Sequence, residues 1–134
     1  MYLKKLSLIN FKNIREENLE FRPGINCFVG DNGAGKTNVI DAVYFLSMCK
    51  SSLAMTDGQS MRHGSDFFLL DGQYLTDGGR NESVVCAFAR KGGKTLKRNG
   101  KEYERLSDHV GLVPAVIVSP ADSAPVSYTH LRAH

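Results

Sequence analysis

The 134-residue chain lacks the long apolar run that a membrane-spanning segment needs. A transmembrane helix takes about 18 or more consecutive apolar residues, and no stretch of the sequence approaches that length. A secretory signal peptide is not expected either, because Lys4, Lys5 and Lys12 interrupt the start and no long apolar core follows them. We therefore expect a cytoplasmic protein that makes no contact with a membrane.

Cysteine and histidine are too few and too scattered to predict a disulfide framework or a metal centre. The three cysteines, Cys27, Cys49 and Cys86, form no C-x-x-C pair, and their odd number argues against paired bridges. Each lies in an apolar context, so we predict three small buried side chains. No ligand spacing relates the histidines to cysteine or to one another. The histidines are His63, His109, His130 and His134.

What the sequence does contain is a phosphate-binding motif. Residues 30–37 fit G-x-x-x-x-G-K-[ST], the loop that joins a buried strand to a helix and holds a nucleoside triphosphate. Glycines let backbone N–H groups turn inward around phosphate oxygens, and the following helix directs its positive end to the same place. Lys36 is expected to contact the β- and γ-phosphates, and the Thr37 hydroxyl to be a ligand of Mg²⁺. The predicted binding residues are Gly30, Asp31, Asn32, Gly33, Ala34, Gly35, Lys36 and Thr37.

The segments on either side of this motif support it. Residues 25–29 are a short, mostly apolar run that suits a buried strand, and residues 38–49 have the pattern of a helix. Apolar residues cover so much of that helix that it should be buried on more than one side. Because strand, loop and helix follow in the order that the motif requires, ATP with Mg²⁺ is the predicted ligand.

Much of the remaining sequence predicts short strands. Residues 3–9 and 19–21 show partial alternation of apolar and polar side chains and predict a hairpin-like pair, interrupted at residues 11–13. Asn99-Gly100 predicts a type I′ hairpin turn, so the middle third of the chain is expected to be antiparallel. Residues 51–64 are polar and are interpreted as a loosely held loop. The other predicted strands are residues 67–70, 73–75, 83–89, 95–97, 102–105 and 113–118.

Positive charge is concentrated in one of the predicted hairpins. Residues 90–105 carry seven basic side chains against two acidic ones, although the formal charge of the whole chain is only +3. Such a cluster can follow a phosphate backbone, but a charge run more often simply faces water. Both interpretations stay open at this point. The basic residues are Arg90, Lys91, Lys94, Lys97, Arg98, Lys101 and Arg105.

Several stretches together resemble bacterial DNA-repair members of the SMC/Rad50 type of ABC ATPase. They are residues 3–13, Pro-Gly-Ile-Asn at 23–26, the phosphate loop with its helix, Lys-Arg-Asn-Gly-Lys at 97–101, and residues 116–123. The resemblance covers nearly all of residues 1–124. It implies an α/β fold: the first lobe of an ABC-type ATPase head, a mixed sheet with an antiparallel β subdomain, truncated before the second lobe.

The same resemblance implies cofactors and partners. In that family ATP is held between two heads, so that nucleotide binding closes a dimer on DNA and hydrolysis opens it. The implied cofactors are ATP and Mg²⁺, and the implied partners are a second copy of the protein, double-stranded DNA with single-strand gap junctions, and recombination mediator proteins. Lys12, Asn13 and Asn38 join the predicted nucleotide site, although Lys12 and Asn13 also suit an exposed hairpin turn. Residues 119–122 fall where relatives place a glutamine that senses the γ-phosphate; no glutamine stands in this stretch, and Asp122 is a weak candidate for that role.

Two elements that hydrolysis needs are missing from the sequence. It has neither the signature motif nor an apolar strand that ends in two acidic residues. Phosphoryl transfer depends on such positioning and charge-stabilising groups, so we expect the chain to bind ATP without hydrolysing it efficiently alone. The alternatives are a small P-loop kinase, another head of the same type, or a DNA-binding module with an incidental nucleotide site. Residues 125–134 change in character and are interpreted as a non-native tail, with the ATP-binding lobe ending near Ala124.

Overall fold

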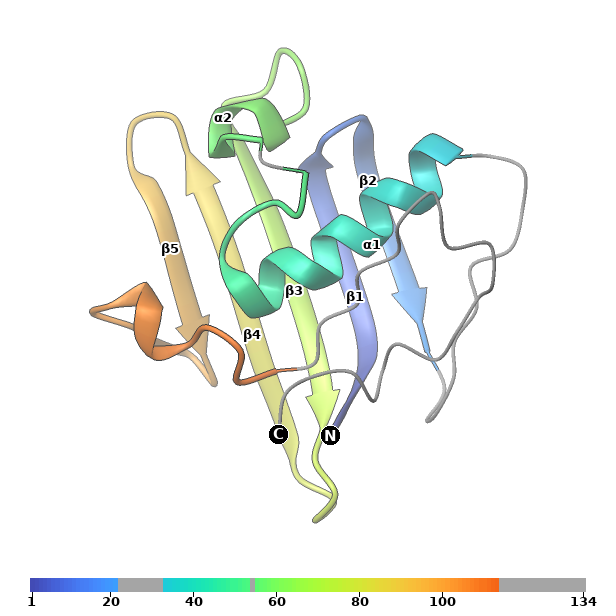
Figure 1. Cartoon of the computed structure of the whole chain (residues 1–134), viewed down its shortest axis with the longest axis vertical. Helices are drawn as coiled ribbons and strands as arrows, with labels where there is room; N and C mark the ends of the chain where they lie inside the picture. The colour runs from blue at the N-terminus through green and yellow to red at the C-terminus, as the bar shows by residue number, and fades with distance from the viewer. Residues whose placement is uncertain (22–32, 54, 114–134) are drawn as a thin grey trace.

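In the computed structural model, which describes residues 1–21, 33–53 and 55–113, a six-stranded sheet carries a long helix on one face (Figure 1). For residues 33–36 only the backbone is described. The strand order is β2-β1-β3-β4-β5-β6, and every pairing among the described strands is antiparallel. The strands are β1 Tyr2–Phe11, β2 Ile14–Glu20, β3 Phe67–Leu75, β4 Asn81–Ala89, β5 Gly93–Arg98 and β6 Lys101–Glu102. The helices are α1 Gly33–Met48, α2 Asp57–Ser60 and the 3₁₀ turn η1 Leu106–Asp108.

The hairpin-like pair predicted at the start of the chain is confirmed, but its second strand is Ile14–Glu20 and not residues 19–21. β1 and β2 form an antiparallel hairpin in which Leu6 lies opposite Leu19. Leu6 and Leu8 are fully buried, whereas the alternate positions Lys5 and Ser7 belong to the other face of the sheet. This alternation is the period-2 pattern of a strand with one face in the core.

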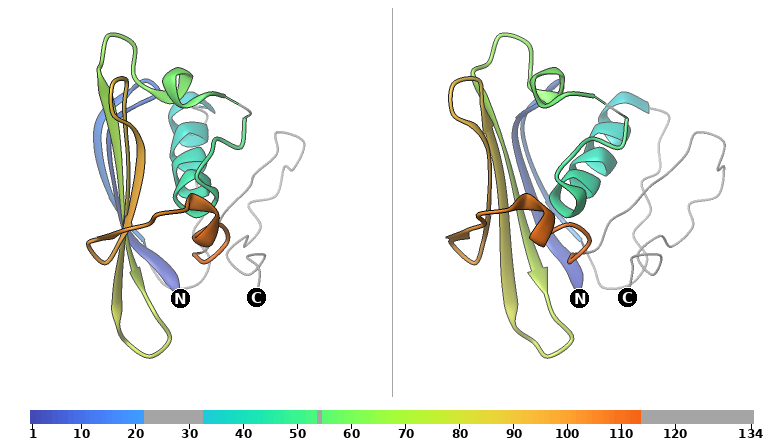
Figure 2. Two further views of the ribbon diagram at one scale, coloured as in Figure 1. Left: turned by 90° about the vertical axis from the view of Figure 1, so that its left-hand side faces the viewer. Right: turned by 60° about the vertical axis from the view of Figure 1, so that its left-hand side comes forward.

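Helix α1 is longer than predicted and begins inside the phosphate-binding motif. It starts at Gly33 rather than at residue 38, because the last residues of such a motif form the first helical turn. The prediction that apolar side chains bury the helix on more than one side is confirmed. The buried apolar residues of α1 are Val39, Ile40, Ala42, Val43, Phe45 and Leu46. Figure 2 shows α1 lying along one face of the sheet, with no described element on the opposite face.

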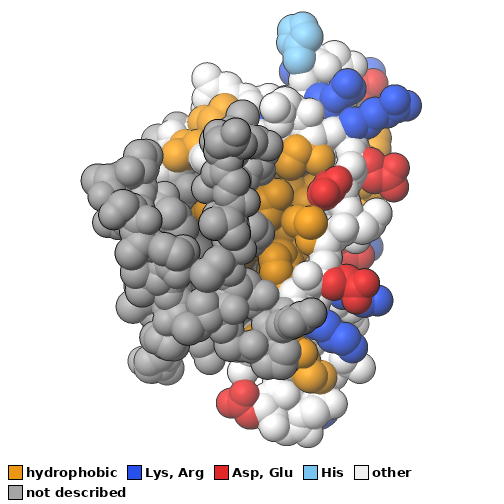
Figure 3. All heavy atoms as spheres, turned by 90° about the vertical axis from the view of Figure 1, so that its right-hand side faces the viewer, with side chains coloured by type: hydrophobic (Ala, Val, Ile, Leu, Met, Phe, Trp, Pro, Cys, Tyr) orange, Lys and Arg blue, Asp and Glu red, His pale blue; other side chains and the backbone are white. Residues whose placement is uncertain are grey.

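Three phenylalanine rings form the centre of the core between α1 and the sheet. Phe11, Phe45 and Phe68 come from β1, α1 and β3, and each is fully buried. Their ring centroids lie 5.4–5.9 Å apart in edge-to-face geometry, which is the favourable arrangement of aromatic quadrupoles. Figure 3 views the β2 edge, where hydrophobic side chains gather beside the charged outer side of the sheet.

Two predicted strands, residues 67–70 and 73–75, are one continuous strand, β3. Asp71 and Gly72, which separate the two predicted strands, pair with β1 and β4 like their neighbours. A Cβ at Gly72 would lie 2.8 Å from Cδ1 of Leu46 and 2.9 Å from Cε1 of Tyr74. The glycine is therefore required by the close approach of these two side chains, and it does not mark a turn.

The interpretation of residues 51–64 as a loosely held loop is wrong. The segment contains α2, whose first turn is closed by a capping box between Thr56 and Gln59. Met61 is buried and forms a bridge with Phe11 of β1. These contacts fix the segment against the end of β1 even though its composition is polar.

The hairpin predicted at Asn99-Gly100 is confirmed, but the strand after it is shorter than expected. Asn99 and Gly100 have φ of 55° and 82°, and they join β5 to β6. β6 ends at Glu102, although the strand was expected to run to residue 105, and the 3₁₀ turn η1 begins at Leu106. The predicted strands at 25–29 and 113–118, Cys27, Asp122 and the tail lie outside the described residues, except that Val113 itself is buried.

Cys49 and Cys86 are buried free thiols, as predicted. Burial raises the pKa of each thiol, so neither carries the thiolate that reacts with oxidants or metals. Among the described helices, none is long and apolar enough to cross a membrane.

Tyr74 is fully buried, and its hydroxyl contacts no hydrogen-bond partner among the described residues. A buried hydroxyl without a partner lowers stability because its hydration is lost on folding. We expect Tyr74→Phe to leave the free energy of unfolding unchanged or to raise it by about 1 kcal/mol in urea titrations. Tyr103→Phe is the matched control, since the Tyr103 hydroxyl contacts His109. A clear loss of stability in Tyr74→Phe would show that its hydroxyl does have a partner.

His109 is a buried histidine that supports the C-terminal half of α1. Its Nε2 lies 2.8 Å from the carbonyl oxygen of Leu46 and donates to it, so Nδ1 is left to accept from the hydroxyl of Tyr103 at 3.3 Å. Burial lowers the pKa of His109; the bond to Leu46 opposes this shift and the Arg98 charge adds to it. The folded protein therefore holds this ring in its neutral form.

This lowered pKa predicts a dependence of stability on pH. An unfolded histidine titrates at about pH 6.5. Below that pH, His109 binds a proton in the unfolded chain but stays neutral in the folded chain until the pH reaches its lower folded pKa. The contribution of His109 is complete above the unfolded pKa and decreases as the pH falls through it toward the lower folded value. We expect urea unfolding from about pH 7.5 to about pH 5 to show a steeper stability loss for the unchanged chain than for His109→Gln. Parallel curves would contradict this assignment.

Candidate functional site

The phosphate-binding motif lies at the start of α1. The backbone of residues 33–36 forms the first helical turn, and Thr37 is exposed directly after it. Gly30, Asp31 and Asn32 lie outside the described residues, as do the side chains of residues 33–36. The helical half of the predicted strand-loop-helix unit is thus in place, whereas the contacts of the loop with phosphate stay a prediction.

The turn between β1 and β2 packs against α1 immediately after the motif. The side-chain amide of Asn38 donates a hydrogen bond to Oδ1 of Asn13 at 2.5 Å. Lys12 Nζ lies 2.6 Å from Oδ2 of Asp41, one helical turn beyond Thr37. Three residues predicted for the nucleotide site from different parts of the sequence are therefore brought together. The alternative of an exposed turn does not fit Lys12, since only 7% of its side chain is exposed.

Asp41 is the centre of a buried polar cluster that the sequence analysis missed. Its Oδ1 accepts from the backbone N–H and the hydroxyl of Ser52, both at 2.6 Å, and its Oδ2 accepts from the hydroxyl of Ser51 at 2.7 Å. Burial by itself would raise the pKa of Asp41, but the bonds from Lys12, Ser52 and Ser51 outweigh it and hold the pKa below its usual value. Asp41 is therefore ionised and pairs with the Lys12 ammonium.

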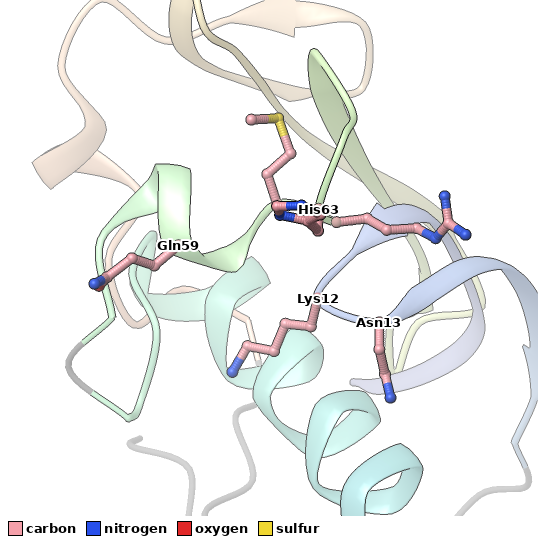
Figure 4. A pocket seen from close by; sticks show the side chains of 6 residues that line it. Lys12, Asn13, Gln59 and His63 are labelled. Carbon is pink, nitrogen blue, oxygen red and sulfur yellow. The ribbon is translucent and has the colours of Figure 1, made fainter.

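A hollow of about 540 Å³ adjoins the same turn (Figure 4). Lys12 and Asn13 line one side, and Figure 4 shows both side chains directed toward α1. The other side is formed by the end of α2 and the residues after it. The remaining lining residues are Gln59, Met61, Arg62 and His63. Three of the six lining residues are basic or can become so, which suits an anionic ligand.

The basic residues between 90 and 105 separate into two groups. Lys94 Nζ lies 3.2 Å from Asp57 of α2, and Arg98 forms an ion pair of 2.5 Å with Glu82 of β4. Lys94 and Arg98 flank buried Leu96 on the face of β5 that is directed toward the helix, and their ion pairs stabilise the fold. No ion pair involves the others within the described part of the chain. They are Arg90, Lys91, Lys97, Lys101 and Arg105.

Comparison with known families identifies the class of protein. A family model described as an AAA domain matches residues 5–112, and the chain belongs to this family. Within it, the chain is similar to the amino-terminal part of the DNA replication and repair protein RecF. It is 53% identical over 123 residues to RecF of Phocaeicola vulgatus and 49% identical over 122 residues to RecF of Flavobacterium johnsoniae. These matches cover 92% and 91% of this chain but only 33% and 34% of the relatives, so the chain spans about a third of their length.

Solved structures agree with this result. The recombination mediator protein RecF in complex with ATP superposes with a TM-score of 0.81 at 28% identity, over 90% of this chain and 32% of that protein. The SMC head domain from Thermotoga maritima gives a TM-score of 0.62 at 28% identity, over 81% of this chain and 40% of that one. The predicted first lobe of an SMC/Rad50-like ATPase head is confirmed. The described strands form the antiparallel part of the predicted sheet.

Proposed function

We propose that the chain is the ATP-binding first lobe of a RecF-type protein of DNA replication and repair. The observation that carries the proposal is the packing of Lys12 and Asn13 on α1 directly after the phosphate-binding motif. A kinase would need a second substrate pocket and usually an arginine-bearing lid. The antiparallel sheet that makes up most of the described chain offers no obvious place for either.

The motif supplies the parts that hold the triphosphate. Backbone N–H groups of residues 30–37 surround the phosphates, Lys36 contacts the β- and γ-phosphates, and the Thr37 hydroxyl is a ligand of Mg²⁺. The first turn of α1 contains no acidic residue that would oppose the attraction between the positive end of the helix and a bound anion. Lys12, Asn13 and Asn38 lie beside the nucleotide on the side of the hollow.

Hydrolysis is expected to require groups that this sequence does not contain. A donor that stabilises transition-state charge is typically worth about 3–4 kcal/mol, and the signature motif and the acidic strand end are absent. We propose that the complete protein forms an ATP-dependent homodimer, with each signature motif facing the phosphate loop of the other copy. The proposed partners of that dimer are double-stranded DNA, junctions with single-strand gaps and recombination mediator proteins, in the cytoplasm.

Calorimetry with ATP and Mg²⁺ tests the nucleotide part of this proposal. We expect saturable binding at one site per chain, with single-turnover hydrolysis near the uncatalysed rate. Incubation with labelled ATP and small acceptor metabolites tests the kinase alternative. Transfer of phosphate to an acceptor in the absence of DNA would support the kinase and contradict the proposal, as would the absence of ATP binding.

Exposed lysines of the β5–β6 hairpin are candidates for contact with DNA. We expect the double variant Lys97→Glu with Lys101→Glu to weaken DNA binding and to reduce the salt slope of log K by about 0.9 per lost phosphate contact. Lys4→Glu with Lys50→Glu is the control, because both of these lysines are exposed and the change in net charge is the same. Fluorescence anisotropy at several salt concentrations measures both slopes. If the two double variants behave alike, the hairpin simply faces water.

A further inference from the structure

Lys12 occupies an unusual position for a lysine. Its φ of 56° lies in the left-handed region, which long side chains seldom adopt. Its side chain is only 7% exposed, and Asp41 is the anion that the described residues place beside its ammonium group. A strained backbone and a buried cation both lower stability, so their combination in one turn indicates a role other than stability.

Asp41 and Lys12 depend on each other unequally. Three of the four donors that surround the Asp41 carboxylate come from Ser51 and Ser52, so the carboxylate keeps most of its hydrogen bonds if Lys12 leaves. The Lys12 ammonium can donate three hydrogen bonds, and besides the ion pair with Asp41 it has no hydrogen-bond partner among the described residues. Lys12 therefore has N–H donors left for a second anion, while Ser51 and Ser52 hold the Asp41 carboxylate in place.

The position of Asp41 on α1 connects this cluster to the motif. Asp41 lies four residues after Thr37, so both are on the same side of the helix. Ser51 and Ser52 begin the segment that continues through α2 to Arg62, which lines the other side of the hollow. Asp41 therefore links both sides of the hollow to the helix that begins in the phosphate-binding motif.

We infer that Asp41 is a positioning residue, held by Ser51 and Ser52, that keeps the Lys12 ammonium beside the nucleotide site and so raises the affinity for ATP. This inference rests on the proposed ATP site and concerns residues outside the phosphate loop. Asp41 makes no contact with the nucleotide itself. Its effect arises because a side chain fixed in its binding position loses less conformational freedom when the ligand arrives.

A double-mutant cycle measured by calorimetry with ATP and Mg²⁺ tests the inference. Asp41→Asn and Lys12→Met should each lower the affinity about tenfold. The double variant should bind no more weakly than Lys12→Met, because Asp41 acts only through Lys12. Ser47→Ala is the control: Ser47 is buried on the same helix and donates to the carbonyl of Val113, away from Lys12. It should leave the affinity unchanged.

Additive losses in the double variant would overturn the inference, because they would show a general structural effect. An unchanged or increased affinity in Asp41→Asn would also overturn it, since Asp41 would then be neutral or repel the triphosphate. If binding is abolished by Lys36→Ala but not altered by Asp41→Asn, the inference fails and the proposed function stands. Absence of ATP binding by the unchanged chain would remove both.

Asp41→Asn leaves a buried cation without its anion, which destabilises the fold. A milder change, Ser52→Ala, tests the same inference. Ser52 is exposed, and its replacement removes one hydrogen bond to Asp41 but leaves the Asp41 carboxylate beside Lys12. We expect Ser52→Ala to weaken ATP binding roughly threefold in the unchanged background and not at all in Lys12→Met. Equal weakening in both backgrounds would overturn the inference.

Discussion

Lys36→Ala is expected to abolish measurable ATP binding by any protein that contains this lobe. The ammonium of Lys36 is the one side-chain charge that the motif directs at the β- and γ-phosphates. Hydrogen bonds to charged groups contribute about 1.5–3 kcal/mol each. Loss of two such contacts weakens binding by more than about a hundredfold. Isothermal titration calorimetry with ATP and Mg²⁺ measures the effect.

Lys50→Ala is the control for this experiment. Lys50 is exposed just beyond the other end of α1, so its loss changes the net charge equally without touching the phosphate-binding end. We expect its affinity for ATP to equal that of the unchanged chain. Full binding by Lys36→Ala would reject the assignment of residues 30–37 as the triphosphate site.

Phe68→Ala is expected to cause the largest loss of stability. Its ring is fully buried and contacts Phe11 and Phe45 edge to face, and it stacks on Phe88. Truncation of a buried phenylalanine removes apolar burial and leaves a cavity, which together cost about 3–5 kcal/mol. Such a loss is a large part of the total stability of a small domain. Urea unfolding monitored by circular dichroism gives the difference.

The neighbouring residue provides a matched control. Phe67 precedes Phe68 on β3 but belongs to the other face of the sheet, where 45% of it is exposed. We expect Phe67→Ala to change the free energy of unfolding by less than about 1 kcal/mol. Equal losses in the two variants would contradict the placement of the core between α1 and one face of the sheet.

Local patterns predicted the parts of the fold that local chemistry determines. Alternation predicted β1, and the Asn99-Gly100 turn followed from the ability of both residues to adopt positive φ. Residues 51–64 were misinterpreted because their polar composition outweighed the Thr56 and Gln59 spacing of a capping box. The division of β3 failed for a different reason: Gly72 is needed by side chains from α1 and its own strand, and such close packing has no local signature.

The candidate site shows the same limit. The motif and the resemblance gave Lys12, Asn13 and Asn38, but nothing in the sequence pairs Lys12 with Asp41. Asp41 did have one signal, an acidic residue within an otherwise apolar stretch of helix. Strand alternation likewise places Lys94 on the same face as buried Leu96, so it could have been separated from the exposed lysines.

A structure of the chain bound to ATP and Mg²⁺ tests the central claim most directly. The account predicts a triphosphate enclosed by main-chain N–H groups of residues 30–37, with the Lys36 amine at the β- and γ-phosphates and Thr37 on the metal ion. Lys12 and Asn13 should lie beside the same nucleotide. A nucleotide bound elsewhere, or residues 30–37 extended and without contact to phosphate, would contradict it.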